Sequence, residues 1–504
     1  MALIGLEGES VEIESDCGAG PVAFHLVGLA DKSIEEARER VRSAIKNTGL
    51  LFPRSRVTVN LAPADLKKFG SLYDLPIAVS ILLGSGQLER GESFEDSMFI
   101  GELALDGKIR GVNGALAVAV SMKALGKKKI FLPEENLEEV SIVSGIEIYP
   151  LKSLEQLVAH FKNETPMIPF QPKDSEKKII VDKNLIDFTQ IKGQAQAKRA
   201  LLIAACGGHN ILLYGPPGSG KTMLARSLPS ILPILTSEES LEVTKIYSIA
   251  GLLLHKGGLM CVRPFRSPHH SASAASIIGG GRVPGPGEVS LAHRGVLFLD
   301  EFAEFPKCVI ENLRQPLEDG VVTVSRVYRT IQYPSRFILV AAMNPCPCGY
   351  FHDSVRQCVC SSEQVRKYQK RISGPILDRI DLHIEVPRVK FEDLYENKAS
   401  GEAVEEVQKK VLEVRKIQQD RFEKNGILTN AEMDSKKVEK FCHLDVDILA
   451  FFKKASEKLQ LSARSSNRVL KIARTIADLD GSETLKMEHL TEALQYRPRN
   501  LLEE

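Results

Sequence analysis

One octapeptide restricts the possible folds of this chain more than any other feature. Residues 215–222 have the pattern G-x-x-x-x-G-K-S/T, with a short apolar run before them (211–214) and a helix-favouring segment after them (223–226). Glycines let backbone N–H groups close around a phosphate, and the following helix adds the positive end of its dipole. In this context the pattern predicts a phosphate-binding loop rather than a chance glycine-rich turn. Its residues are Gly215, Pro216, Pro217, Gly218, Ser219, Gly220, Lys221 and Thr222.

A second motif supplies the acids that such a loop needs. The apolar run 296–299 ends in Asp300 and Glu301, and a continuous apolar run is typical of a strand buried on both faces of a parallel sheet. Lys221 is expected to reach the β- and γ-phosphates, and Thr222 and Asp300 to hold Mg²⁺. Glu301 is expected to polarise the attacking water. The alternative for the two acids is the start of a solvated helix.

Strand-like and helical patterns alternate around these motifs, which predicts an α/β fold with a parallel sheet and helices on both faces. Ligands of such sheets bind beyond the carboxyl ends of the strands. Asn344 follows one expected strand, and its amide is expected to orient the lytic water; the alternative is a turn asparagine before Pro345. The expected elements are a helix at 195–206 and strands at 211–214, 296–299, 337–342 and 382–386.

Composition and pattern divide the chain into four segments. They are an alternating strand-and-helix domain at 1–162, a polar, proline-containing linker at 163–184, the nucleotide-motif domain at 185–392 and a helical domain at 393–504. Amphipathic, charge-rich patterns at 403–424 and 468–479 predict long helices in the last domain.

The bulk composition excludes several classes of protein. The 504 residues are 43% apolar, enough for two to four domain cores. A net charge of +1 excludes a uniformly basic protein that coats nucleic acid, but it permits a local basic channel. The first ten residues carry acids and no basic stretch, and no apolar run approaches the ~20 residues that span a bilayer. We therefore expect a cytoplasmic protein.

Four of the nine cysteines lie within fifteen positions: Cys346, Cys348, Cys358 and Cys360. In a reducing compartment, such a cluster indicates a metal site before it indicates disulfides, and four thiolates suit a structural Zn²⁺. The one-residue gaps are tighter than the usual spacing, so His352 as a replacement ligand and unliganded thiols remain alternatives.

The order of the motifs resembles the AAA+ ATPase family, and more narrowly its magnesium-chelatase-like branch, the YifB/ComM family. The resemblance covers nearly the whole chain and implies an AAA+ parallel sheet with a helical lid, ATP and Mg²⁺ as ligands, and a homo-hexameric ring. The stretches that carry it are GPPGSGKTMLARSLPSILP (215–233), FRSPHHSAS (265–273), GEVSLAHRGVLFLDEFAEF (287–305), LRQPLEDG (313–320), AAMNPCPCG (341–349) and SARSSNRVLKIARTIADL (462–479).

Two arginines take roles from this resemblance. Arg379 matches the finger that a neighbouring subunit inserts at the γ-phosphate, where a guanidinium offsets the charge of phosphoryl transfer. The alternative is a local ion pair with Asp378 or Asp381. Arg464 matches the sensor-2 arginine of the lid, with Arg468 as the nearby alternative.

The first domain is similar to the catalytic domain of Lon protease (an α+β, S5-domain-2-like fold) over residues 60–86 and 100–137. That enzyme uses a Ser-Lys dyad. The matching positions here carry neither residue, and Ser71 and Lys123 are out of register. We therefore expect an inactive protease fold that serves assembly or DNA contact.

Two segments are candidates for DNA contact. Residues 263–294 are basic and rich in glycine and proline, which predicts long mobile loops, and the resemblance implies an insertion that projects into a central pore. Residues 321–329 alternate as a hairpin should. Guanidinium groups for phosphates and an aromatic ring for bases suit a single-strand channel, although these charges can instead pair with the next subunit. The candidates are Arg266, Arg282, Arg326, Tyr328 and Arg329.

Together these features predict an ATP-driven ring motor acting on single-stranded or branched DNA. The resemblance implies a helicase or branch-migration factor in natural transformation or homologous recombination, with recombination proteins as possible partners. One alternative is the ATPase subunit of a metal-chelatase-like complex, and another is a nucleotide-switched scaffold.

Overall fold

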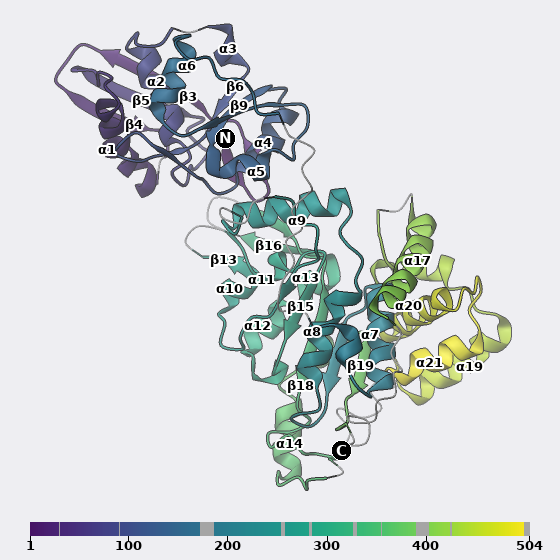
Figure 1. The fold of residues 1–504 in the computed structure, drawn as a ribbon. Coiled ribbons are helices and arrows are strands. Elements are labelled where there is room, and N and C mark those ends of the chain that lie inside the picture. The colour runs from purple at the N-terminus through teal and green to yellow at the C-terminus, as the bar shows by residue number, and fades with distance from the viewer. Residues whose placement is uncertain are drawn as a thin grey trace.

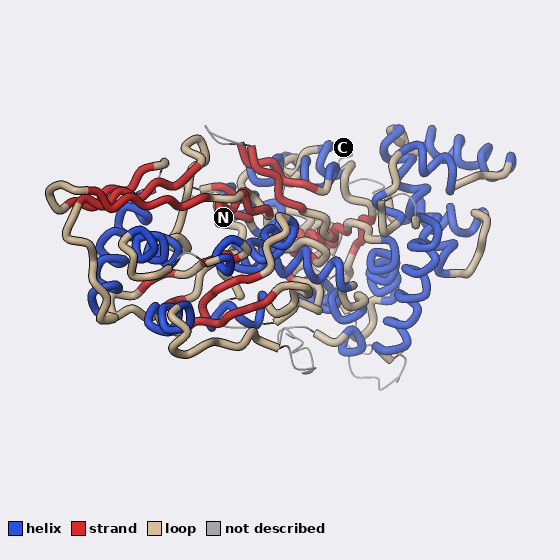
Figure 2. Tube along the Cα trace, turned by 90° about the horizontal axis from the view of Figure 1, so that it is seen from above, coloured by secondary structure: helices blue, strands red, loops and turns tan. Residues whose placement is uncertain are grey.

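The computed structural model describes residues 1–29, 31–89, 91–171, 186–253, 258–281, 285–325, 330–353, 355–389, 403–423 and 426–497. An amino-terminal strand-and-helix part adjoins a central sheet with helices, and a helical carboxyl-terminal part lies at the side of that sheet (Figure 1). Viewed from above, red strands run across blue helices at the left of Figure 2, and the right end is helical.

The amino-terminal part holds two three-stranded sheets, in the orders β3-β5-β4 and β10-β9-β6. Side chains of β5 alternate between buried and partly exposed, whereas α2 and α4 are apolar on nearly every side and fill the core between the layers. The elements are β1 Ala2–Ile4, β2 Glu7–Glu9, β3 Glu12–Gly18, β4 Ala23–Val27, α1 Lys32–Asn47, β5 Arg56–Ala62, α2 Asp74–Gly84, α3 Glu92–Glu95, β6 Ser97–Phe99, β7 Glu102–Leu103, β8 Ile109–Arg110, α4 Ala115–Ala124, β9 Lys129–Pro133, α5 Leu137–Val140, β10 Glu147–Leu151 and α6 Leu154–Phe161.

The central part is built on a five-stranded parallel sheet in the order β12-β15-β18-β11-β19. Successive residues of β11, β15 and β18 enter two different apolar clusters, one on each face, so both faces are covered as continuous apolar runs require. The α/β parallel-sheet prediction is therefore confirmed. The strands are β11 Ile211–Tyr214, β12 Phe265–Arg266, β15 Val296–Leu299, β18 Ile338–Met343 and β19 Leu382–Glu385.

Helices and two small hairpins surround this sheet. They are α7 Ala195–Gly207, α8 Lys221–Ile231, α9 Ser237–Ile249, α10 Ala274–Ile278, α11 Glu288–Leu291, α12 Lys307–Asn312, α13 Arg314–Asp319, α14 Ser362–Gln369 and α15 Gly374–Leu377, with the pairs β13 Gly279–Gly280 and β14 Gly285–Pro286, and β16 Val321–Ser325 and β17 Thr330–Pro334. The hairpin predicted at 321–329 includes β16, its partner strand β17 follows at Thr330–Pro334, and residues 326–329 lie outside the described residues.

The segment 263–294 is more ordered than its glycine and proline content predicts. Its described residues include β12, which pairs with β15, and helices α10 and α11. The expectation of long mobile loops is wrong for these residues, because buried neighbours such as Ile277 and Val289 fix them to the core.

The described residues of the carboxyl-terminal part form five helices, of which α17 and α20 pack against α7, and α17 also packs against α8. Arg415 and Gln418 of α17 donate to the last carbonyls of α7, at Ala205 and Cys206. The helix expected at 468–479 begins earlier, where the Ser462 side chain caps the backbone N–H of Ser465. The helices are α17 Val404–Phe422, α18 Ser435–Phe441, α19 Val446–Lys458, α20 Ala463–Leu479 and α21 Met487–Gln495.

Helix α4 joins the amino-terminal part to the central part by contacting α9. The backbone N–H of Gly114 donates to the carbonyl of Ser248 at 3.0 Å. Gly114 has φ +80°, and a Cβ there would lie 2.3 Å from Leu3 Cδ1, so the contact requires glycine. The linker expected at 163–184 falls mostly outside the described residues, since the structure describes it only as far as residue 171.

Candidate functional site

The phosphate loop lies at the carboxyl end of β11, where α8 begins at Lys221. Gly218 and Gly220 have φ of +75° and +91°, which is the left-handed region that a tight anion-binding loop uses. A Cβ on Gly215 would lie 2.2 Å from the carbonyl oxygen of Val386, just beyond β19. The neighbouring strand therefore fixes the start of the loop and leaves its N–H groups for a ligand.

Lys221 lies within the loop and is 9% exposed. Its Nζ donates to the carbonyls of Gly215 and Pro216 at 2.7 and 2.9 Å and lies 3.3 Å from Asn344 Oδ1. Burial lowers the pKa of the Lys221 ammonium to about 8. The ammonium thus lies beside the Asn344 side chain, just beyond β18. An incoming phosphate would replace the carbonyl oxygens of Gly215 and Pro216 as its hydrogen-bond acceptors.

Thr222 and Asp300 meet at the same sheet edge, because β15 and β11 flank β18 and run parallel. The Thr222 hydroxyl donates to Asp300 Oδ2 at 2.9 Å, and the other Asp300 oxygen accepts from the N–H of Glu301. A hydroxyl and a carboxylate in contact form a fitting oxygen ligand pair for Mg²⁺. The two acids follow β15 directly, and the element that begins after them is a short 3₁₀ turn (302–304) rather than an α-helix.

Glu301 has φ +52°, a strained value for a side-chain-bearing residue, and its carboxylate is more than half exposed. His270 Nδ1 lies 2.9 Å from Glu301 Oε2, and the His270 ring also meets the edge of Phe305. No sequence motif predicts this pairing. The one available signal is that His270 follows β12 and Glu301 follows β15, because these two strands are neighbours in the sheet.

Arg379 and Arg464 lie at the opposite edge of the sheet. Arg379 precedes β19, and its carbonyl accepts from the side chain of Asn210, the residue before β11. The four residues of β11 separate this edge from the phosphate loop by about 13 Å, at ~3.3 Å per residue. These arginines are therefore remote from the loop of their own chain.

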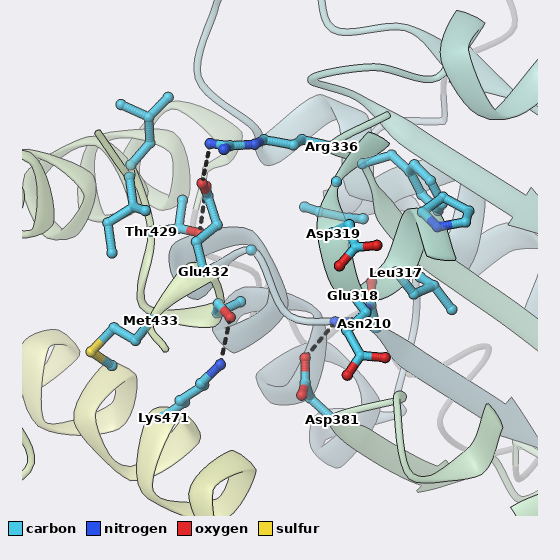
Figure 3. Close-up of a pocket in the computed structure, with 18 of the residues that line it drawn as sticks. Asn210, Leu317, Glu318, Asp319, Arg336, Asp381, Thr429, Glu432, Met433 and Lys471 are labelled. Carbon is cyan, nitrogen blue, oxygen red and sulfur yellow. Dashed lines mark hydrogen bonds and ion pairs between the residues drawn. The ribbon is translucent and has the colours of Figure 1, made fainter. Parts of the chain in front are cut away.

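Arg379 pairs with Glu318 and with neither Asp378 nor Asp381, so the predicted alternative partners are wrong. The same carboxylate accepts from Arg464 at 2.6 Å. Arg468 pairs instead with Asp381, whose side chain is 2% exposed, in a structural contact between lid and core. Figure 3 shows Glu318 and Asp381 on the wall of a cavity of about 600 Å³ between these two parts.

The four clustered cysteines converge. All four Sγ atoms lie within 4.8 Å of one another, and the closest pairs are 3.4 to 3.7 Å apart. A tetrahedral Zn²⁺ with bonds of ~2.3 Å requires sulfur separations of about 3.8 Å, so the cluster fits this ion. Backbone N–H donors lower the pKa of Cys348 to about 6, whereas burial raises the pKa of Cys346 to about 12, so the fit to a metal rests on the positions of the sulfur atoms. The predicted alternative ligand, His352, is not in the group, and its ring lies tilted against that of Phe351.

The cysteine loop also contacts the phosphate loop. It begins two residues after Asn344 and continues to Gly349, which has φ +85°. A Cβ at Gly349 would lie 2.7 Å from the ring of Pro217. The cluster therefore borders the nucleotide site, and its geometry affects the positions of both Pro217 and Asn344.

Of the five candidate DNA contacts, Arg266 alone lies among the described residues. Its guanidinium forms two hydrogen bonds with Glu288, at 2.6 and 2.8 Å, and this pairing raises its pKa. Arg266 is thus paired with Glu288 of its own chain, and its contact with DNA stays a prediction. Arg282, Arg326, Tyr328 and Arg329 lie outside the described residues.

Three family models match consecutive parts of the chain. Residues 13–136 match subunit ChlI of Mg-chelatase, residues 187–394 match magnesium chelatase, subunit ChlI, and residues 401–497 match the C-terminal part of that subunit. Competence protein ComM of Haemophilus influenzae is 44% identical over 501 residues, which are 98% of this chain and 96% of that protein. This chain belongs to the YifB/ComM family.

Other members and relatives agree with this placement. YifB of Escherichia coli is 41% identical to this YifB/ComM-family protein over 497 residues, 98% of this chain and 96% of that one. A magnesium-chelatase 67 kDa subunit of Chlorobaculum parvum is 30% identical over 167 residues, 32% of this chain and 24% of that protein. The match over 187–394 includes the phosphate loop and the acids after β15, and it supports an AAA+ ATPase.

Ser71 and Lys123 of this YifB/ComM-family protein have separate partners. Ser71 Oγ donates to Glu102, and Lys123 Nζ donates to the carbonyl of Ser144. Asp74, near the expected nucleophile position, is buried and receives two hydrogen bonds from Arg40. Within the described part of the chain, no helix is both long and apolar enough to cross a bilayer.

Proposed function

We propose that this protein is an ATP-driven ring motor that moves single-stranded or branched DNA, as a helicase or branch-migration factor in natural transformation or homologous recombination. The observation that carries the ATP-driven part is the convergence of Lys221, Thr222, Asp300 and Asn344 at one sheet edge. The DNA part is supported by the 44% identity to a competence protein.

In this proposal, each side chain acts on the triphosphate from a fixed place. Lys221 binds the β- and γ-phosphate oxygens while the loop N–H groups hold the β-phosphate. Glu301 orients and accepts a proton from the attacking water, which Asn344 also positions. Mg²⁺, held by Thr222 and Asp300, neutralises charge on the phosphates when it is bound.

Arg379 and Arg464 complete the site of the next subunit in a homo-hexamer, because they lie at the other edge of their own sheet. A guanidinium at the γ-phosphate stabilises the charge that develops in phosphoryl transfer. We propose the same arrangement at every interface of the ring. Recombination proteins are possible further partners.

The decisive experiment measures ATP hydrolysis and Holliday-junction migration by the full-length protein. Hydrolysis is expected to rise when branched or single-stranded DNA is added, and Lys221→Ala is expected to lower it by about 10²–10³-fold, because a charge at the phosphates is lost. Lys192→Ala, on the exposed segment before α7, serves as the matched control. Turnover indifferent to DNA but stimulated by a porphyrin-loading partner would instead favour the ATPase subunit of a metal-chelatase-like complex, which the ChlI matches support.

We also propose that the cysteine cluster holds a structural Zn²⁺, with no open position for a substrate. Elemental analysis of the purified protein is expected to find about one zinc per chain. Cys358→Ser is expected to lower this content, whereas Cys308→Ser, which alters an exposed thiol outside the cluster, should not. Protein that folds and hydrolyses ATP without stoichiometric zinc would contradict the assignment.

The amino-terminal part is proposed to be a Lon-protease-like domain without proteolytic activity, within the four-domain plan 1–162, 163–184, 185–392 and 393–504. The separate partners of Ser71 and Lys123 support this, since a Ser-Lys dyad requires the two side chains in contact. Casein cleavage that Ser71→Ala abolishes would refute it.

A further inference from the structure

One carboxylate holds the two arginines of the trans site together. Glu318 Oε2 accepts from Arg379 Nη2, and Glu318 Oε1 accepts from Arg464 Nη2 at 2.6 Å. The three residues come from separate elements: the end of α13, the turn after α15 and the start of α20. Figure 3 shows the Glu318 side chain on the cavity wall formed by α13, beside Asp319 and Asn210.

This contact occupies the donors that a phosphate would need. Arg379 is 9% exposed on its side chain, and its Nη1 donates to the carbonyl of Pro375 while its Nη2 donates to Glu318. Carboxylate and phosphate oxygens compete for the same guanidinium donors. Arg379 therefore has to exchange Glu318 for phosphate oxygens before it can act on a neighbouring triphosphate, and Arg464 has to do so at Nη2.

The exchange is physically accessible. The Glu318 side chain is 42% exposed and that of Arg464 is 51% exposed, so water screens the attraction and can replace either partner. The two arginines hold the pKa of Glu318 below its usual value, Arg379 having the larger effect, so the carboxylate stays charged. Arg468 is no part of this exchange, because it is bound to the buried Asp381.

Helix α13 connects Glu318 to the β16–β17 hairpin. Only Asp319 and Gly320 separate Glu318 from β16. The side-chain amide of Gln315 in α13 donates to the Thr323 hydroxyl of β16 at 3.0 Å, and Ser335 N–H donates to the carbonyl of Gly320. The helix and the base of the hairpin are thus joined by side-chain and backbone bonds, and a displacement of the hairpin moves the carboxylate.

We propose that Glu318 is a positioning residue that withholds Arg379 and Arg464 from the neighbouring subunit's triphosphate and releases them when the hairpin is displaced. This inference rests on the proposed function, in which DNA acts on the ring and both arginines act in trans. A displacement of the hairpin would then affect ATP hydrolysis at the neighbouring subunit's site through Glu318 and the two arginines, without involving the phosphate loop of its own chain.

The test is the ATPase rate of full-length Glu318→Gln without DNA. The neutral amide competes less well for the guanidinium groups, so this rate is expected to rise about two- to tenfold, the range that one partly exposed ion pair supports. Added DNA is expected to stimulate the variant less than the wild type. Thermal denaturation verifies that both proteins are folded.

Two further variants make the result specific. Glu432→Gln removes a similar pair, to Arg336 at 2.7 Å, on the same cavity, and its rate should match the wild type. The triple variant Glu318→Gln/Arg379→Ala/Arg464→Ala should be as slow as Arg379→Ala/Arg464→Ala, because the gain acts through these two guanidinium groups.

A Glu318→Gln rate at or below the wild-type rate, or a triple variant faster than Arg379→Ala/Arg464→Ala, would overturn the inference. Failure of the proposed function appears differently. In that case, wild-type turnover is absent, insensitive to Lys221→Ala or insensitive to DNA, whatever residue occupies position 318.

Discussion

Glu301→Gln is expected to lower ATP turnover by about 10²–10⁴-fold while nucleotide affinity stays near the wild-type value. The substitution keeps the shape of the side chain but removes the oxygen that accepts the proton of the attacking water. Lys221, Thr222 and Asp300, which contact the phosphates and Mg²⁺ in the proposed site, are unchanged. Steady-state hydrolysis and equilibrium binding of a labelled nucleotide measure the two effects separately.

Glu304→Gln is the matched control for this prediction. Glu304 ends the 3₁₀ turn (302–304) that follows Glu301. Its carboxylate pairs with Arg371 rather than facing the nucleotide site. Its loss should leave turnover unchanged. Equal turnover in Glu301→Gln and the wild type would show that another group activates the water.

Arg379→Ala is expected to lower turnover by about 10³–10⁵-fold, the range known for arginine fingers. Because Arg379 lies at the sheet edge remote from its own phosphate loop, the loss should fall on the site of the neighbouring subunit. A mixture of Arg379→Ala and Glu301→Gln chains should therefore recover activity. Where the first chain supplies Glu301 and the second supplies Arg379, the shared site is intact.

The mixing experiment also separates catalysis from folding. Arg379 is largely buried, so its removal can destabilise the chain, but a misfolded chain cannot contribute a working phosphate loop to the mixture. A mixture no more active than its more active component would contradict action in trans. Arg371→Ala, which alters an exposed arginine paired with Glu304, provides the control.

The parts of the site that the sequence predicts are contiguous motifs with a required backbone context. The phosphate loop needs its preceding strand and following helix, and Asp300, Glu301 and Asn344 each follow an apolar run of strand length. A parallel sheet with β18 between β11 and β15 then brings these strand ends together. The rule that ligands bind at the carboxyl ends of strands is sufficient for this region.

The parts that it does not predict are pairings between distant elements. Arg379 and Arg464 are separated by 61 and 146 positions from Glu318, their shared partner, and no local pattern specifies that they meet. No local pattern specifies the pairing of Arg266 with Glu288 either. The exposure of a charged side chain depends on such tertiary partners. The number of arginines in a segment does not show which of them have partners within the chain.

Placement of the two arginines at the edge remote from the phosphate loop has a consequence for assembly. In the proposed ring, each protomer contributes half of two different ATP sites, so a solitary protomer has no complete site. An open chain of protomers has one complete ATP site fewer than it has protomers, and closure of the ring forms the last site. The specific ATPase activity should consequently rise with protein concentration and become constant only when all the protomers are in closed rings.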